Sequence, residues 1–178
     1  MASKAIYVAD SDSLINLHRH FGSKAIRVLQ KKVKDETLKL PEGVVREILR
    51  GTDALARFVK ECRQNLEVNF GGNSRLSEEL AQMERKYGQT ILVGTQKYPG
   101  FWHSKAGRKS ADAQVVAAAK FFGWTVVSND QAVGLACSLE GVVCIGWAEF
   151  ARILGLTQQL RLFEERGTDQ DADNSRSH

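Results

Sequence analysis

Short apolar runs alternate along the chain with longer segments of helical periodicity, and this alternation is the strongest constraint on the fold. The strand-like runs cover residues 6–9, 38–40, 66–70, 125–127 and 142–145. Apart from the segments around Glu47 and Asp112, helical periodicity covers residues 13–21, 24–34, 53–65, 75–87 and 148–154. Strands and helices that alternate in sequence pack as a parallel sheet covered by helices, so the pattern predicts an α/β fold.

Small polar residues and glycines indicate where some of these helices begin and end. We expect Ser23 to cap the helix at 24–34 and Thr52 to cap the helix at 53–65. Gly51 is expected to end the helix that carries Glu47. Residues 95–110 contain one proline and two glycines, and we expect them to be irregular.

Length and composition favour one domain. The chain has 178 residues, of which 43% are hydrophobic and 26% charged, enough to bury a sizeable core. We expect a single domain over residues 1–166 and a disordered polar tail at 167–178. The formal net charge is +4. Residues 164–178 hold five acids and two bases, a net of −3, which leaves +7 on the rest. A nucleic acid partner would fit that charge, and so would a merely solubilising surface.

The sequence offers no sign of a membrane segment, a signal peptide or a zinc site. No apolar run approaches the roughly 20 residues that span a bilayer. The N-terminus lacks a signal-peptide pattern, so a cytoplasmic protein is expected. Cys62, Cys137 and Cys144 lack the spacing of metal ligands, and we interpret them as reduced, small core residues.

Asp112 occupies a position where the pattern predicts a hydrophobic residue. At helical spacing it shares one face with Val115, Val116 and Ala119, and that face should be buried. An unpaired carboxylate in a packed interior costs several kcal/mol unless a cation meets it. Asp112 is therefore a candidate functional residue.

Three further acids flank core elements in a comparable way. Asp10 follows the strand-like run at 6–9, and Asp130 follows the run at 125–127. Glu47 borders the apolar face of its helix and can point inward. The carboxyl ends of parallel strands are where ligands collect in open α/β sheets, so we expect these acids to lie near Asp112.

Four gathered carboxylates require protons or cations. Two carboxylates about 5 Å apart repel by about 3 kcal/mol at an effective dielectric near 20. Mg²⁺ or Mn²⁺ prefers oxygen ligands and keeps several waters, one of which can attack a phosphodiester. The pattern therefore favours a metal-dependent hydrolase.

The acids and their neighbours resemble the motif set of the PIN-domain family. The matching segments are Val8-Ala9-Asp10-Ser11-Asp12-Ser13-Leu14-Ile15, an inward Glu47, Ala111-Asp112-Ala113 and Val127-Ser128-Asn129-Asp130. The resemblance implies a three-layer α/β/α fold with a parallel five-stranded sheet. It also implies Mg²⁺- or Mn²⁺-dependent ribonuclease activity and, in many members, the toxin role of a toxin–antitoxin pair.

Carried over by residue, the resemblance makes four acids the catalytic metal ligands: Asp10, Glu47, Asp112 and Asp130. Ser11, Asp12 and Asn129 would support them. Asp12 departs from the family pattern, which more often has Asn or Ser there. The stretch between Glu47 and Asp112 is longer than in compact toxin members. An antitoxin protein and a second copy of the chain are candidate partners besides RNA.

A basic, aromatic-containing stretch leads directly into the Asp112 helix. Bases and aromatic rings that alternate are typical of surfaces that stack unpaired nucleotides. The candidate RNA-binding residues are Lys97, Trp102, Lys105, Arg108 and Lys109. The aromatic residues could equally pack against the core.

Each acid also has a simpler interpretation. Asp10 or Asp130 alone could be a turn or helix-cap residue, Asp12 could be an N-cap, and Glu47 could be solvated.

The alternative enzyme is a haloacid-dehalogenase-like phosphohydrolase with Asp10 as nucleophile, because Asp10-Ser11-Asp12-Ser13 resembles its motif. A receiver-like phosphoacceptor ranks third, and a PIN-like module that binds RNA or protein without cleavage is the non-enzymatic alternative.

We predict that replacing Lys105, Arg108 and Lys109 together by alanine weakens RNA binding mainly at low salt. Each lost phosphate contact should reduce the slope of log affinity against log salt concentration by about 0.7 for single-stranded RNA. Binding titrations at several salt concentrations measure this slope. A triple variant with the wild-type affinity and slope would show that RNA lies elsewhere.

Overall fold

The computed structural model describes residues 4–88, 90–98, 100 and 110–157. Its centre is a five-stranded sheet in the order β3-β2-β1-β6-β7, and all four neighbouring pairs are parallel. The strands are β1 (Tyr7–Ala9), β2 (Leu38–Pro41), β3 (Glu67–Val68), β6 (Thr125–Val127) and β7 (Cys144–Ile145). The predicted α/β class with a five-stranded parallel sheet is confirmed.

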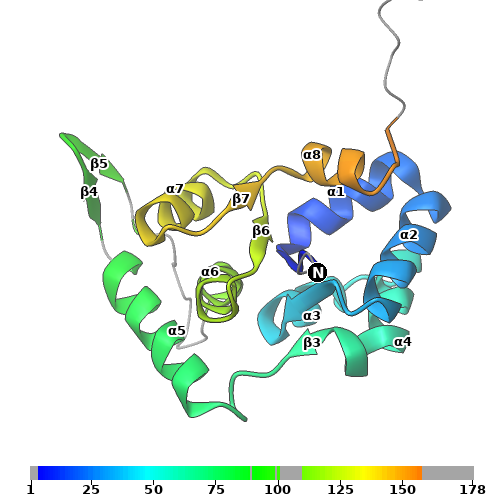
Figure 1. Ribbon diagram of the computed structural model, residues 1–178, viewed down its shortest axis with the longest axis horizontal. Coiled ribbons are helices and arrows are strands. Elements are labelled where there is room, and N and C mark those ends of the chain that lie inside the picture. Colours follow the sequence, from blue (N-terminus) through cyan, green and yellow to red (C-terminus); the bar gives the residue numbers. More distant parts are fainter. Residues whose placement is uncertain (1–3, 89, 99, 101–109, 158–178) are drawn as a thin grey trace, which may run out of the picture.

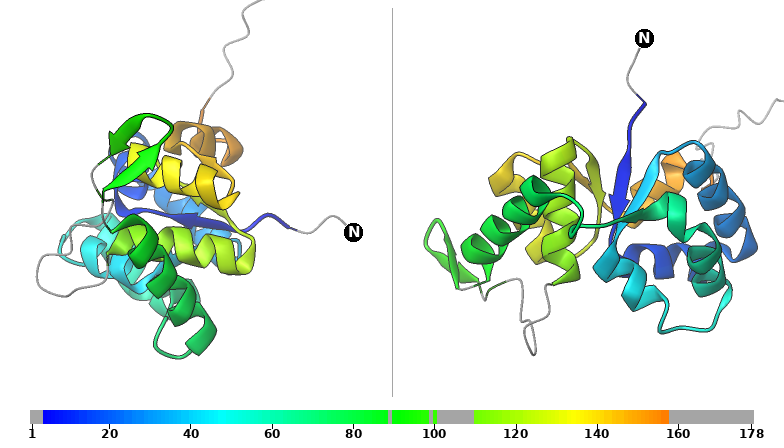
Figure 2. Two further views of the ribbon diagram at one scale, coloured as in Figure 1. Left: turned by 90° about the vertical axis from the view of Figure 1, so that its left-hand side faces the viewer. Right: turned by 90° about the horizontal axis from the view of Figure 1, so that it is seen from below.

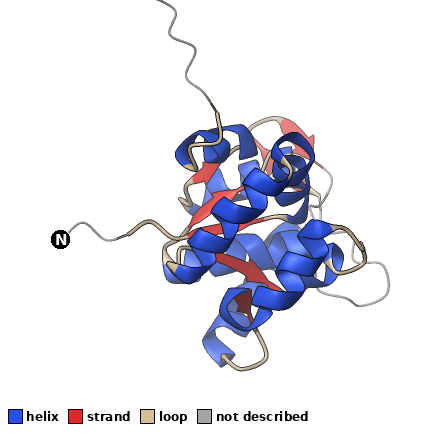
Figure 3. Ribbon diagram, turned by 90° about the vertical axis from the view of Figure 1, so that its right-hand side faces the viewer, coloured by secondary structure: helices blue, strands red, loops and turns tan. Residues whose placement is uncertain are grey.

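Helices cover both faces of the sheet, so the fold is a three-layer α/β/α sandwich (Figure 1). One face carries α1 (Ser11–Phe21), α2 (Ser23–Lys34), α4 (Ala54–Leu66) and α8 (Trp147–Ile153). The other face carries α5 (Ser74–Tyr87), α6 (Ala111–Phe122) and α7 (Gln131–Glu140). The right-hand view of Figure 2 shows β1 running between these two groups. The strands lie inside the surrounding helices in Figure 3.

The middle of the sheet is buried on both faces because its central strands, β1 and β6, are almost entirely apolar. Val8, Ala9, Val126 and Val127 are completely inaccessible to solvent. Near-continuous apolar runs are what a strand covered on two sides requires. The central strands β1 and β6 therefore lie where the sequence predicted them.

The connection after β2 differs from an ordinary crossover, because the short helix α3 (Glu42–Ile48) precedes α4. It contacts α1, α4 and α6. Since α3 follows directly from the carboxyl end of β2, it brings Glu47 to the edge of the sheet where β1 also ends.

Several predicted boundaries were wrong. Strand β3 covers only two residues, because α4 extends through Leu66 into the predicted strand. Ser23 is the first residue of α2, and the capping position belongs to Gly22, which makes no side-chain cap. The cap of α4 is Asp53 and not Thr52, since the Asp53 carboxylate accepts the amide hydrogen of Ala56 at 2.9 Å.

Two elements were not predicted. Helix α7 has small residues and a glycine at Gly134, which hide its periodicity, although Asp130 caps its start and Gly141 ends it. The segment predicted to be irregular begins within a hairpin of β4 (Ile91–Val93) and β5 (Gln96–Tyr98). Gly94 has a φ of 62° and so permits the tight turn between the two strands.

The hairpin extends outward beside α5 and α7 (Figure 1). Within the described residues, no helix is both long enough and apolar enough to cross a bilayer. The predicted tail at 167–178 lies outside the described residues, as does the end of the predicted domain.

We predict that Asp53→Ala lowers the free energy of unfolding by about 1 kcal/mol, because it leaves the Ala56 amide without its cap. Thr52→Ala should change the free energy by less than about 0.5 kcal/mol, since Thr52 is exposed and caps nothing. Urea denaturation of the purified variants measures both.

Asp53→Asn is the matched control. It keeps an oxygen acceptor for the cap but removes the charge that lies 3.6 Å from Nδ1 of His18. Equal losses in Asp53→Asn and Asp53→Ala would assign the stabilisation to that ion pair and contradict the capping role.

Candidate functional site

The two acids that follow β1 and β6 are both helix caps. Asp10 caps α1, with its Oδ1 accepting the Ser13 amide hydrogen at 2.8 Å. Asp130 caps α7 in the same way, with Val133 as the donor at 2.9 Å. The capping interpretation is therefore correct for both residues. Each cap uses one of the two carboxylate oxygens. The cap therefore fixes the side chain and leaves the second oxygen able to accept a hydrogen bond or to bind a cation.

The register of the sheet brings these two caps to the same edge. Ala9 lies opposite Val127, so β1 and β6 end together. The amide of Asp10 and the hydroxyl of Ser13 both donate to the Val127 carbonyl, at 3.1 and 3.2 Å. Asp10 and the segment that leads to Asp130 are thus held together by direct hydrogen bonds.

Glu47 reaches this edge from α3. The Ser11 hydroxyl donates to its Oε2 at 2.7 Å, which links the exposed Glu47 to the first residue of α1. The structure therefore places Ser11 in contact with one of the four predicted ligands. Asp12 is exposed in the first turn of α1, and its interpretation as an N-cap is wrong because Asp10 occupies that position.

Asp112 lies in the first turn of α6, the helix that packs against β1 and β6, and is partly buried. The pKa of its carboxyl is raised to about 7, first because partial burial disfavours the charged form and also because four other acids act on it. These acids are Asp130, Glu47, Asp10 and Asp12, in order of decreasing effect. Within the described residues, which leave out 101–109 just before α6, no cation is among the groups that shift this pKa. The charges of four carboxylates thus act on Asp112, and no described basic side chain offsets them.

Asn129 is exposed and has a clear structural contact. Its Oδ1 accepts the Trp147 amide hydrogen at 2.7 Å and so joins the loop after β6 to the start of α8. A Cβ on Gly146 would lie 3.1 Å from the Asn129 amide, so only glycine fits there without a shift. Whether Asn129 also supports a metal ion stays a prediction.

The donor chemistry of the site fits Mg²⁺ or Mn²⁺, because every group in it is a hard carboxylate oxygen. The spatial arrangement of these carboxylates does not by itself form a metal site. In the part of the chain that the structure describes, no three His, Cys, Asp or Glu side chains are grouped so that they could hold a metal ion. The acids are therefore an electrostatically coupled cluster and not a preformed coordination shell.

The structure describes only one of the five predicted RNA-binding residues. Lys97 is exposed on β5 of the hairpin. Trp102, Lys105, Arg108 and Lys109 lie outside the described residues, and so their proposed contact with RNA stays a prediction.

Sequence analysis missed three polar residues that organise the site. Ser13 and Ser128 are buried beside the caps, and the Ser128 hydroxyl accepts the Asp130 amide hydrogen at 3.0 Å. Gln114 is fully buried in α6. A polar side chain within an apolar helical run was the signal that identified Asp112, and the same signal could have identified Gln114.

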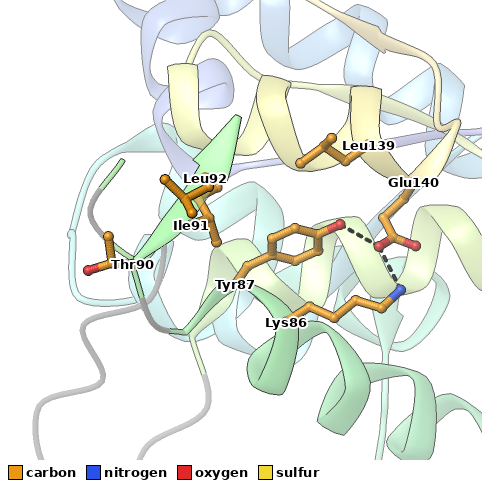
Figure 4. Close-up of a pocket in the computed structure, with 7 residues that line it drawn as sticks. All are labelled: Lys86, Tyr87, Thr90, Ile91, Leu92, Leu139 and Glu140. Atoms are coloured by element: carbon orange, nitrogen blue, oxygen red, sulfur yellow. Dashed lines mark hydrogen bonds and ion pairs between the residues drawn. The ribbon is translucent and has the colours of Figure 1, made fainter. Parts of the chain in front are cut away.

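A depression of about 510 Å³ lies elsewhere, between α5, β4 and α7 (Figure 4). The Tyr87 hydroxyl and the Lys86 ammonium converge there on Glu140, which also binds Lys120 at 2.8 Å. Burial alone would raise the pKa of Glu140, but its bonds to Lys120, Lys86 and Tyr87 lower it to about 2. This ion network is neutralised and ties three helices together, so we interpret it as structural.

Comparison with known proteins gives one family and a structural likeness. The family described as Domain of unknown function (DUF4411) matches residues 7–152, a range that includes all four predicted ligands. No curated protein matches the sequence. Among solved structures, the chain is similar to the one in "Crystal structure of PAE2754 from Pyrobaculum aerophilum", with 16% identity and a TM-score of 0.49. The match covers 86% of this chain and 98% of the other.

We predict that Asp112→Asn stabilises the metal-free protein at pH 8. The pKa of Asp112 is about 7 in the folded state, against an ordinary value of 3.8 for aspartate, so the folded state binds the proton more tightly. Stability from this group is therefore highest at low pH and is lost as the pH rises from about 4 to about 7. Removal of the charge should raise the free energy of unfolding by about 1–3 kcal/mol at pH 8 and change it little at pH 4.

Urea denaturation at both pH values, with chelator present, measures this difference. Glu78→Gln on α5 is the control, because Glu78 is exposed and outside the cluster. Equal effects of Asp112→Asn at pH 4 and pH 8 would contradict the uncompensated charge.

Proposed function

The chain belongs to the DUF4411 family, whose description names no activity, and we propose that it is a Mg²⁺- or Mn²⁺-dependent ribonuclease of PIN-like type. The observation that carries this proposal is the partly buried Asp112, whose pKa is raised to about 7 by burial and by four neighbouring acids. A site in which the described residues supply such repulsion and no basic partner is suited to a divalent cation.

Asp10, Glu47, Asp112 and Asp130 would hold the cation. When bound, the cation would polarise the phosphodiester and supply an activated water. The chain itself orients the ligands. The two caps hold Asp10 and Asp130 at the ends of β1 and β6, and the Ser11 hydroxyl holds Glu47.

Asp112 would make cation binding depend on pH. With a pKa raised to about 7, its carboxyl holds a proton at neutral pH more readily than an ordinary aspartate does. Ligation requires the ionised form, so the apparent affinity for the cation should rise between pH 6 and pH 8.

RNA as substrate is supported by the resemblance to PIN-like nucleases and by the net charge of +7 on residues 1–163. A cytoplasmic location would follow from that substrate. The toxin role, an antitoxin partner and a homodimer rest on the resemblance alone.

The alternative phosphohydrolase would use Asp10 as a nucleophile. Asp10 is only 5% exposed, and one of its oxygens is engaged in the α1 cap, which leaves little room for attack on a phosphomonoester. The two activities are separated by incubating the protein with labelled RNA or with a small phosphomonoester, with Mn²⁺ and with chelator. Turnover of the phosphomonoester without RNA cleavage would overturn the proposal, and metal-independent RNA binding without cleavage would support the non-enzymatic module.

We predict that Asp10→Asn, Glu47→Gln, Asp112→Asn and Asp130→Asn each reduce Mn²⁺-dependent cleavage by about 100-fold or more while the protein stays folded. Folding should survive at the two caps because asparagine keeps an oxygen acceptor and caps helices about as well as aspartate. Single-turnover cleavage of labelled RNA and thermal denaturation measure the two effects.

Glu42→Gln is the matched control for Glu47→Gln. It makes the same change in the same helix but at the opposite end, outside the group that shifts the pKa of Asp112. Wild-type cleavage in any two of the four acid variants would show that these residues do not share one site.

A further inference from the structure

Gln114 is a completely buried amide within the apolar run of α6. Its Oε1 accepts the amide hydrogen of Gly43 at 2.7 Å, and its Nε2 has no hydrogen-bond partner among the described residues. Leucine or methionine would fill the same space without a buried polar group, and an unpaired buried donor is costly. The hydrogen bond that Oε1 accepts is therefore the interaction that explains a glutamine at this position.

The partner of Gln114 lies at the start of α3. Gly43 is in the first turn of that helix, where amide groups lack partners within the helix. A Cβ on Gly43 would lie 2.7 Å from Gln114 Oε1 and 3.1 Å from Cα of Ala111. The first turns of α3 and α6 thus touch at a point that admits only glycine.

This contact lies close to two of the predicted ligands. Glu47 is four residues after Gly43 and so lies one turn further along the same side of α3. Asp112 directly follows Ala111. Any movement of α3 away from α6 at Gly43 would therefore change the separation of Glu47 and Asp112.

We propose that Gln114 is a positioning residue, which fixes Glu47 relative to Asp112 by binding the Gly43 amide and so prepares the two carboxylates for one divalent cation. This inference rests on the proposed metal-dependent function. Gln114 itself touches neither cation nor substrate. Its effect should appear in cation binding more than in RNA binding.

The test uses Gln114→Met, which keeps a similar volume and removes the acceptor. Free Mn²⁺, measured by electron paramagnetic resonance in the absence of RNA, gives the binding constant. We expect Mn²⁺ to bind the variant about tenfold more weakly or worse. The KM for RNA at saturating Mn²⁺ should stay within about twofold of wild type, and hydrogen exchange at the Gly43 amide should accelerate.

Gly43→Ala provides a second variant that acts on the same contact from α3. The added methyl group must displace either α3 or the Gln114 amide, and both changes disturb the contact, so it should weaken Mn²⁺ binding in the same direction. Leu80→Ala is the control for general destabilisation, because Leu80 is fully buried on α5, a helix that carries none of the four predicted ligands. It should lower the melting temperature and leave Mn²⁺ binding unchanged.

The outcomes separate this inference from the proposed function. If the wild-type protein binds Mn²⁺ and Gln114→Met and Gly43→Ala bind it equally well, the positioning role is wrong and the metal site stands. If Leu80→Ala weakens Mn²⁺ binding as much as they do, the effect is one of stability and the inference is also wrong. If the wild-type protein neither binds Mn²⁺ nor cleaves RNA, the proposed function fails and this inference fails with it.

Discussion

The repulsion among carboxylates around Asp112 is the constraint on which the rest of the site depends. Partial burial of Asp112 in the first turn of α6 removes part of the water that would screen its charge, and the neighbouring acids add to the cost. The surrounding hydrogen bonds keep these acids in place in spite of their repulsion. Asp10 and Asp130 are held by the helices that they cap, and Glu47 is held by Ser11.

Two carboxylates in this protein show opposite responses to burial. Glu140 is surrounded by two lysines and a tyrosine, and its pKa falls to about 2. Among the described residues, only acids act on Asp112 by their charge, and its pKa rises to about 7. The fold can therefore neutralise a buried acid with basic side chains. At the carboxyl edge of the sheet, none of the described residues does so.

The sheet was predictable from the sequence because strands buried on both faces must be apolar throughout. The runs that contain Val8 and Val126 are of this kind, and an acid follows each of them. The position of these acids then follows from topology, since parallel neighbouring strands end on the same side. The same reasoning could not find α7 or the β4–β5 hairpin. Gly134 interrupts the helical pattern of α7, and the hairpin is short and depends on a turn at Gly94.

Contacts between helices could not be predicted from the sequence either, because they depend on which residues meet in space. Thr52 and Asp53 are both good capping residues, and only the backbone geometry decides that Asp53 is the cap.

Gln114 could be suspected as a buried polar residue, but its partner lies 71 positions earlier in the chain. The relative placement of Glu47 and Asp112 is therefore a property of the packed helices α3 and α6. Neither acid's local sequence specifies it. A nuclease site of this kind needs more than four acids in the right order, because the packing between their helices must hold them against their own repulsion until a cation binds.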